Sequence, residues 1–278
     1  MLSKDKIISI FCLIDDILHG IDHKEDIRRR VSDSDSEIIL AAILSSTSFY
    51  GNHCSAIRFV KQYGFIPEMV DASRFNRRLH KIANLLYELF EIVSFYFKEF
   101  CCEMQYIIDS FPVPVCNNMR IMNCKILKEE KYRGYTASMG NYFYGIKVQL
   151  LTTKDGIPIA FHFTPRKTGD AKAIGKMIDK LPVKASLYGD SAYTDYAIED
   201  IALERKCISL KIQRKSNAKR IDTLEQKNEK LKMRKRIETT IRDIKKMFSR
   251  TIHAVTLEGF LIKLTLFVFG LQLNKIIN

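Results

Sequence analysis

The sequence lacks the features that mark a secreted or membrane-bound protein. Its seven cysteines are odd in number and form no CxxC pair, which indicates reduced thiols. We also find no cleavable signal in residues 1–9. The apolar stretch at residues 257–273 is interrupted by Glu258, Lys263 and Gln272, which favours a buried closing helix over a transmembrane span. We therefore expect a reduced, cytoplasmic protein with no membrane partner.

Positive charge is abundant and concentrated in one segment. The 278 residues carry a net charge of +13, and residues 205–250 hold 17 Lys and Arg against 5 Asp and Glu. A basic stretch interleaved with aliphatic residues is typical of a surface that binds phosphates, because neutralising phosphates releases condensed counterions. A solvated helical face explains the same charge equally well.

Residues 1–100 show helical periodicity without strand-like alternation, which predicts a small all-helical domain. Within it, residues 73–79 predict a short helix with a basic N-terminal half that carries Arg74, Arg77 and Arg78. This pattern resembles a helix-turn-helix, whose second helix could enter a DNA groove. An ordinary helical packing domain fits the pattern equally well.

From residue 104 the pattern changes to short apolar strands, which are later separated by helices. Lys154-Asp155-Gly156 predicts a tight hairpin turn between two of these strands. Residues 112–140 are expected to form a basic loop that joins the first two strands. Strands are predicted at residues 104–111, 142–152, 157–163, 184–190 and 207–212, and helices at residues 170–181 and 195–205.

This order of elements predicts an α/β protein with a ribonuclease H-like mixed sheet and flanking helices over residues 101–278. We expect the apolar stretch near the C-terminus to form the closing helix of this domain. In such a fold the first and fourth strands lie side by side. Asp109 and Asp190, which end the apolar runs of these two strands, would therefore meet.

Three acidic residues stand in settings that usually hold other residue types. Asp109 and Asp190 end apolar runs, and Glu238 lies on a strongly basic helix. Two divalent ions can hold the attacking and leaving oxygens of a phosphodiester displacement. Magnesium keeps several waters and takes few protein carboxylates, so three acids suffice. A solvated or capping role explains any one acid alone, but their convergence in one fold favours a metal site.

The helix that carries Glu238 also presents a stripe of cations. Arg234, Glu238, Arg242 and Lys245 are spaced by four, four and three residues, so they lie on one side of the helix. One interpretation is a set of surface ion pairs. The other is that Glu238 holds a metal ion while its basic neighbours bind the phosphates on either side of the cleaved bond.

Several short motifs are spread over nearly the whole chain. They are the context of Asp109, residues 142–148, Asp155-Gly156-Ile157-Pro158, Gly189-Asp190-Ser191-Ala192-Tyr193 and residues 73–79. In these motifs and their order the chain resembles the DDE transposases of bacterial insertion sequences, and most of all the insertion-sequence-982 family. Related transposases carry a Tyr-x2-Arg-x3-Glu-x6-Lys signature, which Arg234, Glu238 and Lys245 match, whereas Leu231 stands where the signature has Tyr.

This resemblance implies that Asp109, Asp190 and Glu238 bind two Mg²⁺ ions, which Mn²⁺ can replace, and activate water to cut DNA at the ends of the element. The freed 3′-hydroxyl then attacks target DNA. The implied partners are the terminal inverted repeats, the target duplex and a second copy of the chain, at the nucleoid of a bacterial cytoplasm. The predicted DNA-binding residues are Arg234, Arg242, Lys245, Arg74, Arg77 and Arg78.

Two other functions fit parts of the sequence. A ribonuclease H-like host nuclease would cut without joining, and the carboxylates do not distinguish it from a transposase. A non-catalytic DNA-binding relic would need no metal, although the intact acid triad argues against it. A serine or tyrosine recombinase is disfavoured, because no cluster of Arg and His residues surrounds Ser191 and Tyr193.

Overall fold

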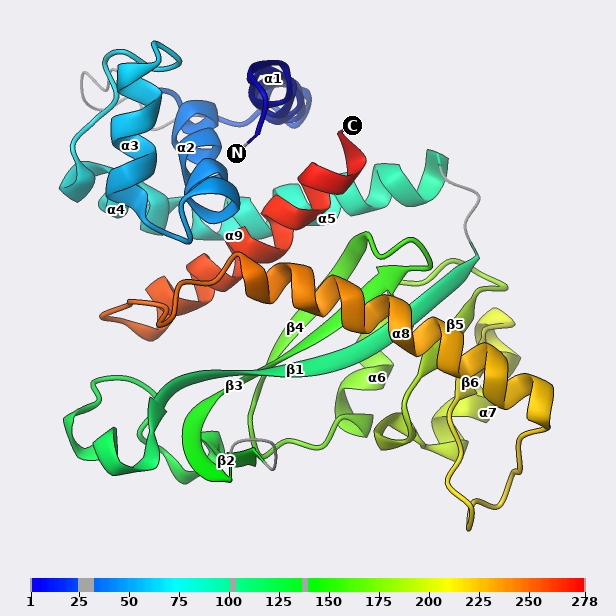
Figure 1. Cartoon of the computed structure of the whole chain (residues 1–278). Helices are drawn as coiled ribbons and strands as arrows, with labels where there is room; N and C mark the ends of the chain where they lie inside the picture. Colours follow the sequence, from blue (N-terminus) through cyan, green and yellow to red (C-terminus); the bar gives the residue numbers. More distant parts are fainter. Residues whose placement is uncertain (1, 25–32, 101–103, 137–139, 278) are drawn as a thin grey trace. The chain divides into compact units, whose positions relative to one another are not determined.

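The computed structural model describes every residue except 1, 25–32, 101–103, 137–139 and 278 (Figure 1). The described chain forms two compact units. One comprises residues 1–93 and 243–278, and the other comprises residues 94–242. The predicted domain boundary after residue 100 adjoins residues 101–103, which lie outside the described residues.

The first unit is helical, as the periodicity of its residues predicts, and α2 lies at its centre. Eleven of the fourteen residues of α2 are buried, and α2 contacts α1, α3, α4 and α9. Ser34 begins α2 with a capping box, in which its side chain and that of Glu37 each bind the other's backbone N–H. The helices are α1 (Lys4–Gly20), α2 (Asp35–Ser48), α3 (His53–Gln62), α4 (Ala72–Lys81), most of α5 (Ala83–Phe100) and α9 (Leu257–Ile276).

Helix α9 packs in this helical unit, whereas the sequence led us to expect it to close the second domain. Ser46 of α2 donates a hydrogen bond to the Leu266 carbonyl at 2.9 Å, and Gly270 lets the two helices approach closely beside Thr47. By length and composition α9 is the one helix among the described residues that could cross a membrane, but 67% of the apolar stretch is buried. It lies inside this unit because both α2 and α9 are apolar on nearly all sides.

The second unit contains a six-stranded mixed sheet in the order β2-β3-β1-β5-β6, with β4 also paired to β3. Strands β1, β3 and β4 are antiparallel, whereas β5 and β6 run parallel to β1. This arrangement confirms the predicted ribonuclease H-like fold. The strands are β1 (Gln105–Asn117), β2 (Arg133–Thr136), β3 (Asn141–Thr153), β4 (Pro158–Pro165), β5 (Ser186–Gly189) and β6 (Ser209–Ile212).

Helices α6 (Ala171–Ile178) and α7 (Tyr196–Lys206) cover one face of the sheet, and α8 (Leu224–Lys246) crosses the opposite face (Figure 1). Ile108 belongs to a core cluster on the side of α6 and α7. Because side chains alternate along a strand, Ile107 and Asp109 point to the side of α8. The strand period therefore decides which residues of β1 can reach helix α8.

The segment expected to be a loop, residues 112–140, is partly structured. Strand β1 continues through Pro112 and Pro114 to Asn117, and β2 lies near the far end of the segment. The sequence predicts that the first strand ends at residue 111, whereas β1 runs on to Asn117. Strand β5 pairs only with residues 105–107 of β1. Beyond residue 107, β5 no longer pairs with β1. Proline, which has no backbone N–H, can therefore stand on this edge of β1 without the loss of a hydrogen bond between strands.

Candidate active site

Asp109 and Asp190 lie on neighbouring strands at the same level of the sheet. Strands β1 and β5 are parallel, with Ile107 opposite Tyr188. Continuing this register by two residues places Asp109 opposite Asp190, just beyond the end of β5. The predicted adjacency of the first and fourth strands is therefore confirmed, and Asp109 points to the side of α8.

Asp190 is fixed by a short turn at the end of β5. It caps the 3-10 helix Ser191–Tyr193, and its Oδ1 accepts a hydrogen bond from the Ala192 backbone N–H at 2.9 Å. A Cβ at Gly189 would lie 3.0 Å from Ile108 Cγ2. Because Gly189 has no side chain, the end of β5 lies close against β1, and this brings Asp190 near Asp109.

Glu238 lies on α8, next to the buried face formed by Ile237 and Ile241. Its Oε1 accepts from Arg234 Nε at 2.9 Å, and both side chains are about half exposed. Arg234 also donates to Gln213 Oε1 at 3.4 Å, directly after β6. The first interpretation of the stripe, a surface ion pair, therefore describes the arrangement that the structure shows.

The electrostatics of Asp109 tie these residues into one site. Burial is the main factor that raises the pKa of Asp109, from 3.8 to about 6, and a hydrogen bond from the Ser110 backbone N–H opposes it. The charges of Asp190 and Glu238 raise the pKa further, and that of Arg234 lowers it. Asp190, Glu238 and Arg234 are therefore close enough to Asp109 to shift its pKa.

The three carboxylates do not form a ready metal cage. Among the described residues, no group of three His, Cys, Asp or Glu side chains could hold a metal ion. The acids are instead occupied by Ser110, Ala192 and Arg234. Their chemistry nevertheless fits a hard divalent cation, since all three offer carboxylate oxygens and a positive charge would relieve the repulsion at Asp109.

The predicted DNA-binding residues fall into two groups. Arg242 and Lys245 are exposed on α8, and Arg74 and Arg77 are exposed on α4. The sixth, Arg78, has an internal role.

The side chain of Arg78 is only 19% exposed, and its guanidinium donates to Asp35 Oδ1 at 2.6 Å and to the Asp33 carbonyl. Arg78 is thus held by contacts within the helical unit, and a DNA contact there stays a prediction. Local sequence patterns do not reveal this pairing, because Asp35 and Arg78 are 43 residues apart.

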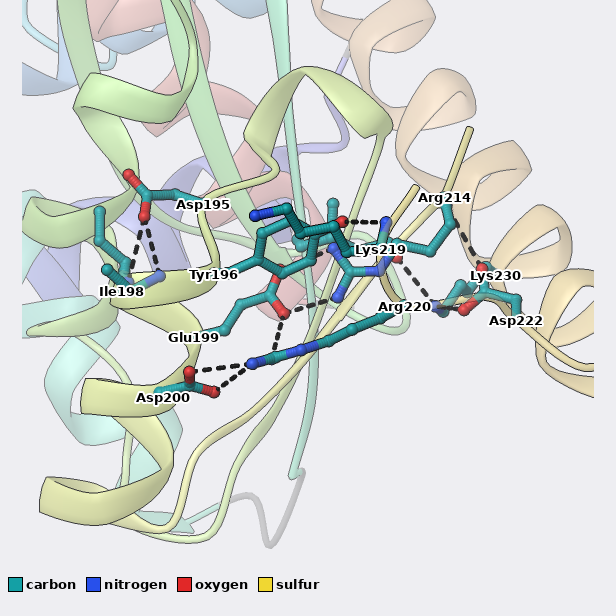
Figure 2. Close-up of polar contacts among 12 residues, drawn as sticks. Asp195, Tyr196, Ile198, Glu199, Asp200, Arg214, Lys219, Arg220, Asp222 and Lys230 are labelled. Atoms are coloured by element: carbon teal, nitrogen blue, oxygen red, sulfur yellow. Dashed lines mark hydrogen bonds and ion pairs between the residues drawn. The ribbon is translucent and has the colours of Figure 1, made fainter. Parts of the chain in front are cut away.

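A network of ion pairs that the sequence did not reveal fastens residues 213–223 between β6 and α8 (Figure 2). Glu199 of α7 accepts two hydrogen bonds from Arg214, at 2.7 and 2.6 Å, and one from Arg220 at 3.2 Å. Glu199 is only 6% exposed. The ring of Tyr196 lies beneath both guanidinium groups, at 5.1 and 5.0 Å.

The same network reaches the first turns of α8. Lys230 contacts Asp222 at 2.5 Å and donates to the Ile212 carbonyl at the end of β6, at 2.8 Å. These contacts fix where α8 begins relative to the sheet. They therefore help to set the position of Glu238, two turns further along the same helix.

The sheet defines a ribonuclease H-like protein, in which Asp109 of β1 lies beside Asp190 at the end of β5. The chain belongs to a transposase family, because the model of the transposase DDE domain matches residues 101–269. A search of the curated proteins finds no match.

Two solved structures are distantly similar to this chain. One is a Mos1 transposase paired-end complex with the left transposon end, which has 10% identity and a TM-score of 0.26 over 86% of this chain and 87% of the other. The second is a pre-cleavage Mos1 transpososome, with 10% identity and a TM-score of 0.24 over 86% of each chain. At these TM-scores, the likeness carries no weight in the assignment.

Proposed function

We propose that this protein is a DDE transposase of the insertion-sequence-982 type, which cuts DNA at the ends of its element and joins the freed 3′-hydroxyl to target DNA. The observation that carries the proposal is the position of Asp109. It lies beside the end of β5, where Asp190 follows, and the charges of Asp190 and Glu238 both act on its carboxylate. In a chain of the transposase DDE family, these are the residues that would do the chemistry.

Asp109, Asp190 and Glu238 would hold two divalent ions, Mg²⁺ or in its place Mn²⁺. When bound, such ions activate water and stabilise the charge that develops on the phosphodiester. The chain's own part begins with Asp109, which must be ionised and is so above pH 6. To hold a metal ion, Glu238 must also give up its ion pair with Arg234. The guanidinium of Arg234 would then be free to bind a phosphate.

Duplex DNA is the proposed partner of both units. Arg234, Arg242 and Lys245 would bind the phosphates that flank the cleaved bond. Residues 1–100 would bind the terminal inverted repeats through the exposed Arg74 and Arg77 of α4. The catalytic domain would begin at residue 101, as the sequence predicts, with α9 packed in the helical unit. Since two element ends must be held together, we expect a homodimer on DNA, at the nucleoid in the bacterial cytoplasm.

A combined cleavage and joining assay tests this proposal. The full chain is incubated with the inverted repeats that flank its gene, in Mg²⁺ or EDTA, beside the variants Asp190→Ala and Asp179→Ala. Asp179 is a suitable control, because its side chain is 78% exposed at the end of α6. We expect metal-dependent joined product from the wild type and Asp179→Ala, and none from Asp190→Ala.

Pre-cleaved ends supplied with a target duplex separate the alternatives. Joined product from these ends supports the transposase. Metal-dependent cutting without joining indicates a nuclease, and DNA binding without either reaction indicates a relic; both results contradict the proposal.

A further inference from the structure

A chain of buried polar side chains lies beneath the candidate active site, on the side of the sheet that faces α6 and α7. It begins at Tyr193, which is 1% exposed and ends the short turn that Asp190 caps. The Tyr193 hydroxyl donates to Oε1 of Gln149, a β3 residue with 0% exposure. A tyrosine hydroxyl and a glutamine amide are thus paired inside an otherwise apolar core.

The far end of this series of side chains is an ion pair between the buried Lys147 and the partly exposed Asp170, and this ion pair orients the glutamine. Gln149 Nε2 donates to Asp170 Oδ1 at 2.6 Å, and Lys147 Nζ donates to the same oxygen at 2.8 Å. Lys147 also donates to the Thr168 carbonyl at 2.9 Å. Because the ionised Asp170 can only accept hydrogen bonds, the amide nitrogen must face it. The amide oxygen is thereby turned toward Tyr193.

This series of polar side chains also lies next to β1, the strand that carries Asp109. Gln149 lies opposite Ser110 in the pairing of β1 with β3, and the Ser110 side chain is near enough to Tyr193 to lower the pKa of its hydroxyl. Ser110 directly follows Asp109. Burial and the charges of Asp170, Asp109 and Asp190 hold the pKa of Tyr193 well above its usual range. One hydroxyl thus lies within the influence of both candidate metal-binding aspartates.

Asp190 needs such an anchor, because the sheet does not hold it. Strand β5 ends at Gly189, so the acid depends on its turn for a fixed position. Within that turn the Tyr193 backbone N–H donates to the Asp190 carbonyl at 3.2 Å, and the Tyr193 side chain fastens the turn to β3.

We propose that Tyr193 is a positioning residue, which holds Asp190 opposite Asp109 through its hydrogen bond to the Gln149–Asp170–Lys147 chain. The inference rests on the proposed function, since it assumes that the two aspartates share a metal site. Loss of the hydroxyl would leave the oriented Gln149 oxygen without its donor and loosen the turn. Changes to residues that orient metal ligands typically lower metal affinity by about 10- to 100-fold.

The test measures metal binding separately from catalysis. Mn²⁺ is titrated into the full-length protein without DNA, and free Mn²⁺ is followed by electron paramagnetic resonance for the wild type, Tyr193→Phe, Asp190→Ala and Tyr144→Phe. The last variant is a matched control, since Tyr144 is also buried but its hydroxyl contacts Glu130 at 3.4 Å, near the opposite end of β3. Cleavage rates are then measured over a range of Mg²⁺ concentrations.

We expect Tyr193→Phe to raise the Kd for Mn²⁺ by about tenfold or more, with cleavage largely restored at saturating Mg²⁺. Tyr144→Phe should match the wild type in both measurements. If Asp190→Ala abolishes binding but Tyr193→Phe binds Mn²⁺ as the wild type does, the inference is wrong and the proposed function stands. A wild type that binds no Mn²⁺, or an Asp190→Ala variant that binds it normally, removes the proposed function and the inference with it.

A second variant breaks the same hydrogen bond from the other side. Gln149→Leu is expected to weaken Mn²⁺ binding, and combining it with Tyr193→Phe should add little, because both changes remove one interaction. Melting temperatures recorded alongside show whether each variant is folded. If the folded variants instead lose affinity for Mn²⁺ independently and additively, the hydrogen bond between Tyr193 and Gln149 is not the cause of the loss, and the inference is wrong.

Discussion

The ionised carboxylate of Asp109 is expected to destabilise the folded protein, so removing its charge should have the unusual effect of raising stability. Burial, the charge of Asp190 and that of Glu238 all disfavour the ionised form, and the pKa rises from 3.8 to about 6. Asp109→Asn removes the charge and keeps an Oδ1 that can accept the 2.7 Å hydrogen bond from the Ser110 backbone N–H. The variant should therefore keep the geometry and lose the electrostatic cost.

The size of this effect follows from the two pKa values. Unfolded chains release the Asp109 proton near pH 3.8, whereas the folded chain retains it until about pH 6. Folding therefore takes up a proton between these values, and stability falls as the pH rises through them. At about 1.4 kcal/mol per pH unit, the full cost above pH 6 is about 3 kcal/mol. Below pH 3.8 the cost disappears, since both states are then protonated.

Urea denaturation in EDTA measures this difference. We expect Asp109→Asn to raise the free energy of unfolding by up to about 3 kcal/mol at pH 7.5 and by much less at pH 4, while abolishing cleavage. Asp179→Asn, at the exposed end of α6, should show no such dependence on pH. A variant that is no more stable than the wild type at pH 7.5, or equally stabilised at both pH values, would refute the reasoning.

Three further predictions concern single charged residues. Metal affinity should decrease below pH 6, because protons then compete for Asp109; Mn²⁺ titrations at pH 5 and pH 7.5 measure this, and equal affinities would contradict it. Arg234→Gln should lower the slope of log binding constant against log salt by about one, whereas Arg78→Gln should lower the melting temperature and leave that slope unchanged. Glu199→Gln should cost about 3–5 kcal/mol of unfolding free energy, because it leaves the buried Arg214 without its carboxylate; urea denaturation with Asp200→Asn as the exposed control checks this, and equal losses would count against a buried clamp.

The sheet could be predicted from the sequence because local patterns specify most of it. Gly156, with φ of +80°, makes the predicted turn between β3 and β4, and the later alternation of strands and helices requires parallel pairing. Where the prediction failed, the cause was a distant partner. Nothing near Pro112 shows that β5 leaves that part of β1 unpaired, and nothing in α9 shows that its apolar surface packs against α2.

The sequence predicts the acids of the candidate site, but it says less about the buried polar residues that lie beneath them. Asp109 and Asp190 stand out because each is a charged residue that ends an apolar run, and the order of strands brings them together. Lys147 and Gln149 left a fainter signal, as two polar residues on one face of an otherwise apolar strand. That alternation could have indicated a buried polar chain, but its partners, Asp170 and Tyr193, follow more than twenty residues later and only the fold brings them near.

The basic segment shows how a charge count can overstate a nucleic-acid surface. Within residues 205–250, Arg214 and Arg220 are paired with Glu199 of α7, and Lys230 is paired with Asp222. These cations fix the start of α8 to the sheet. Because they are already paired with carboxylates, they are less available to bind phosphates. The exposed stripe that begins at Arg234 is a different set of residues on the same helix. We therefore infer that the segment has two roles, in which its first half positions the helix and its second half offers charge to DNA, so the salt dependence of binding should reflect far fewer contacts than its seventeen cations suggest.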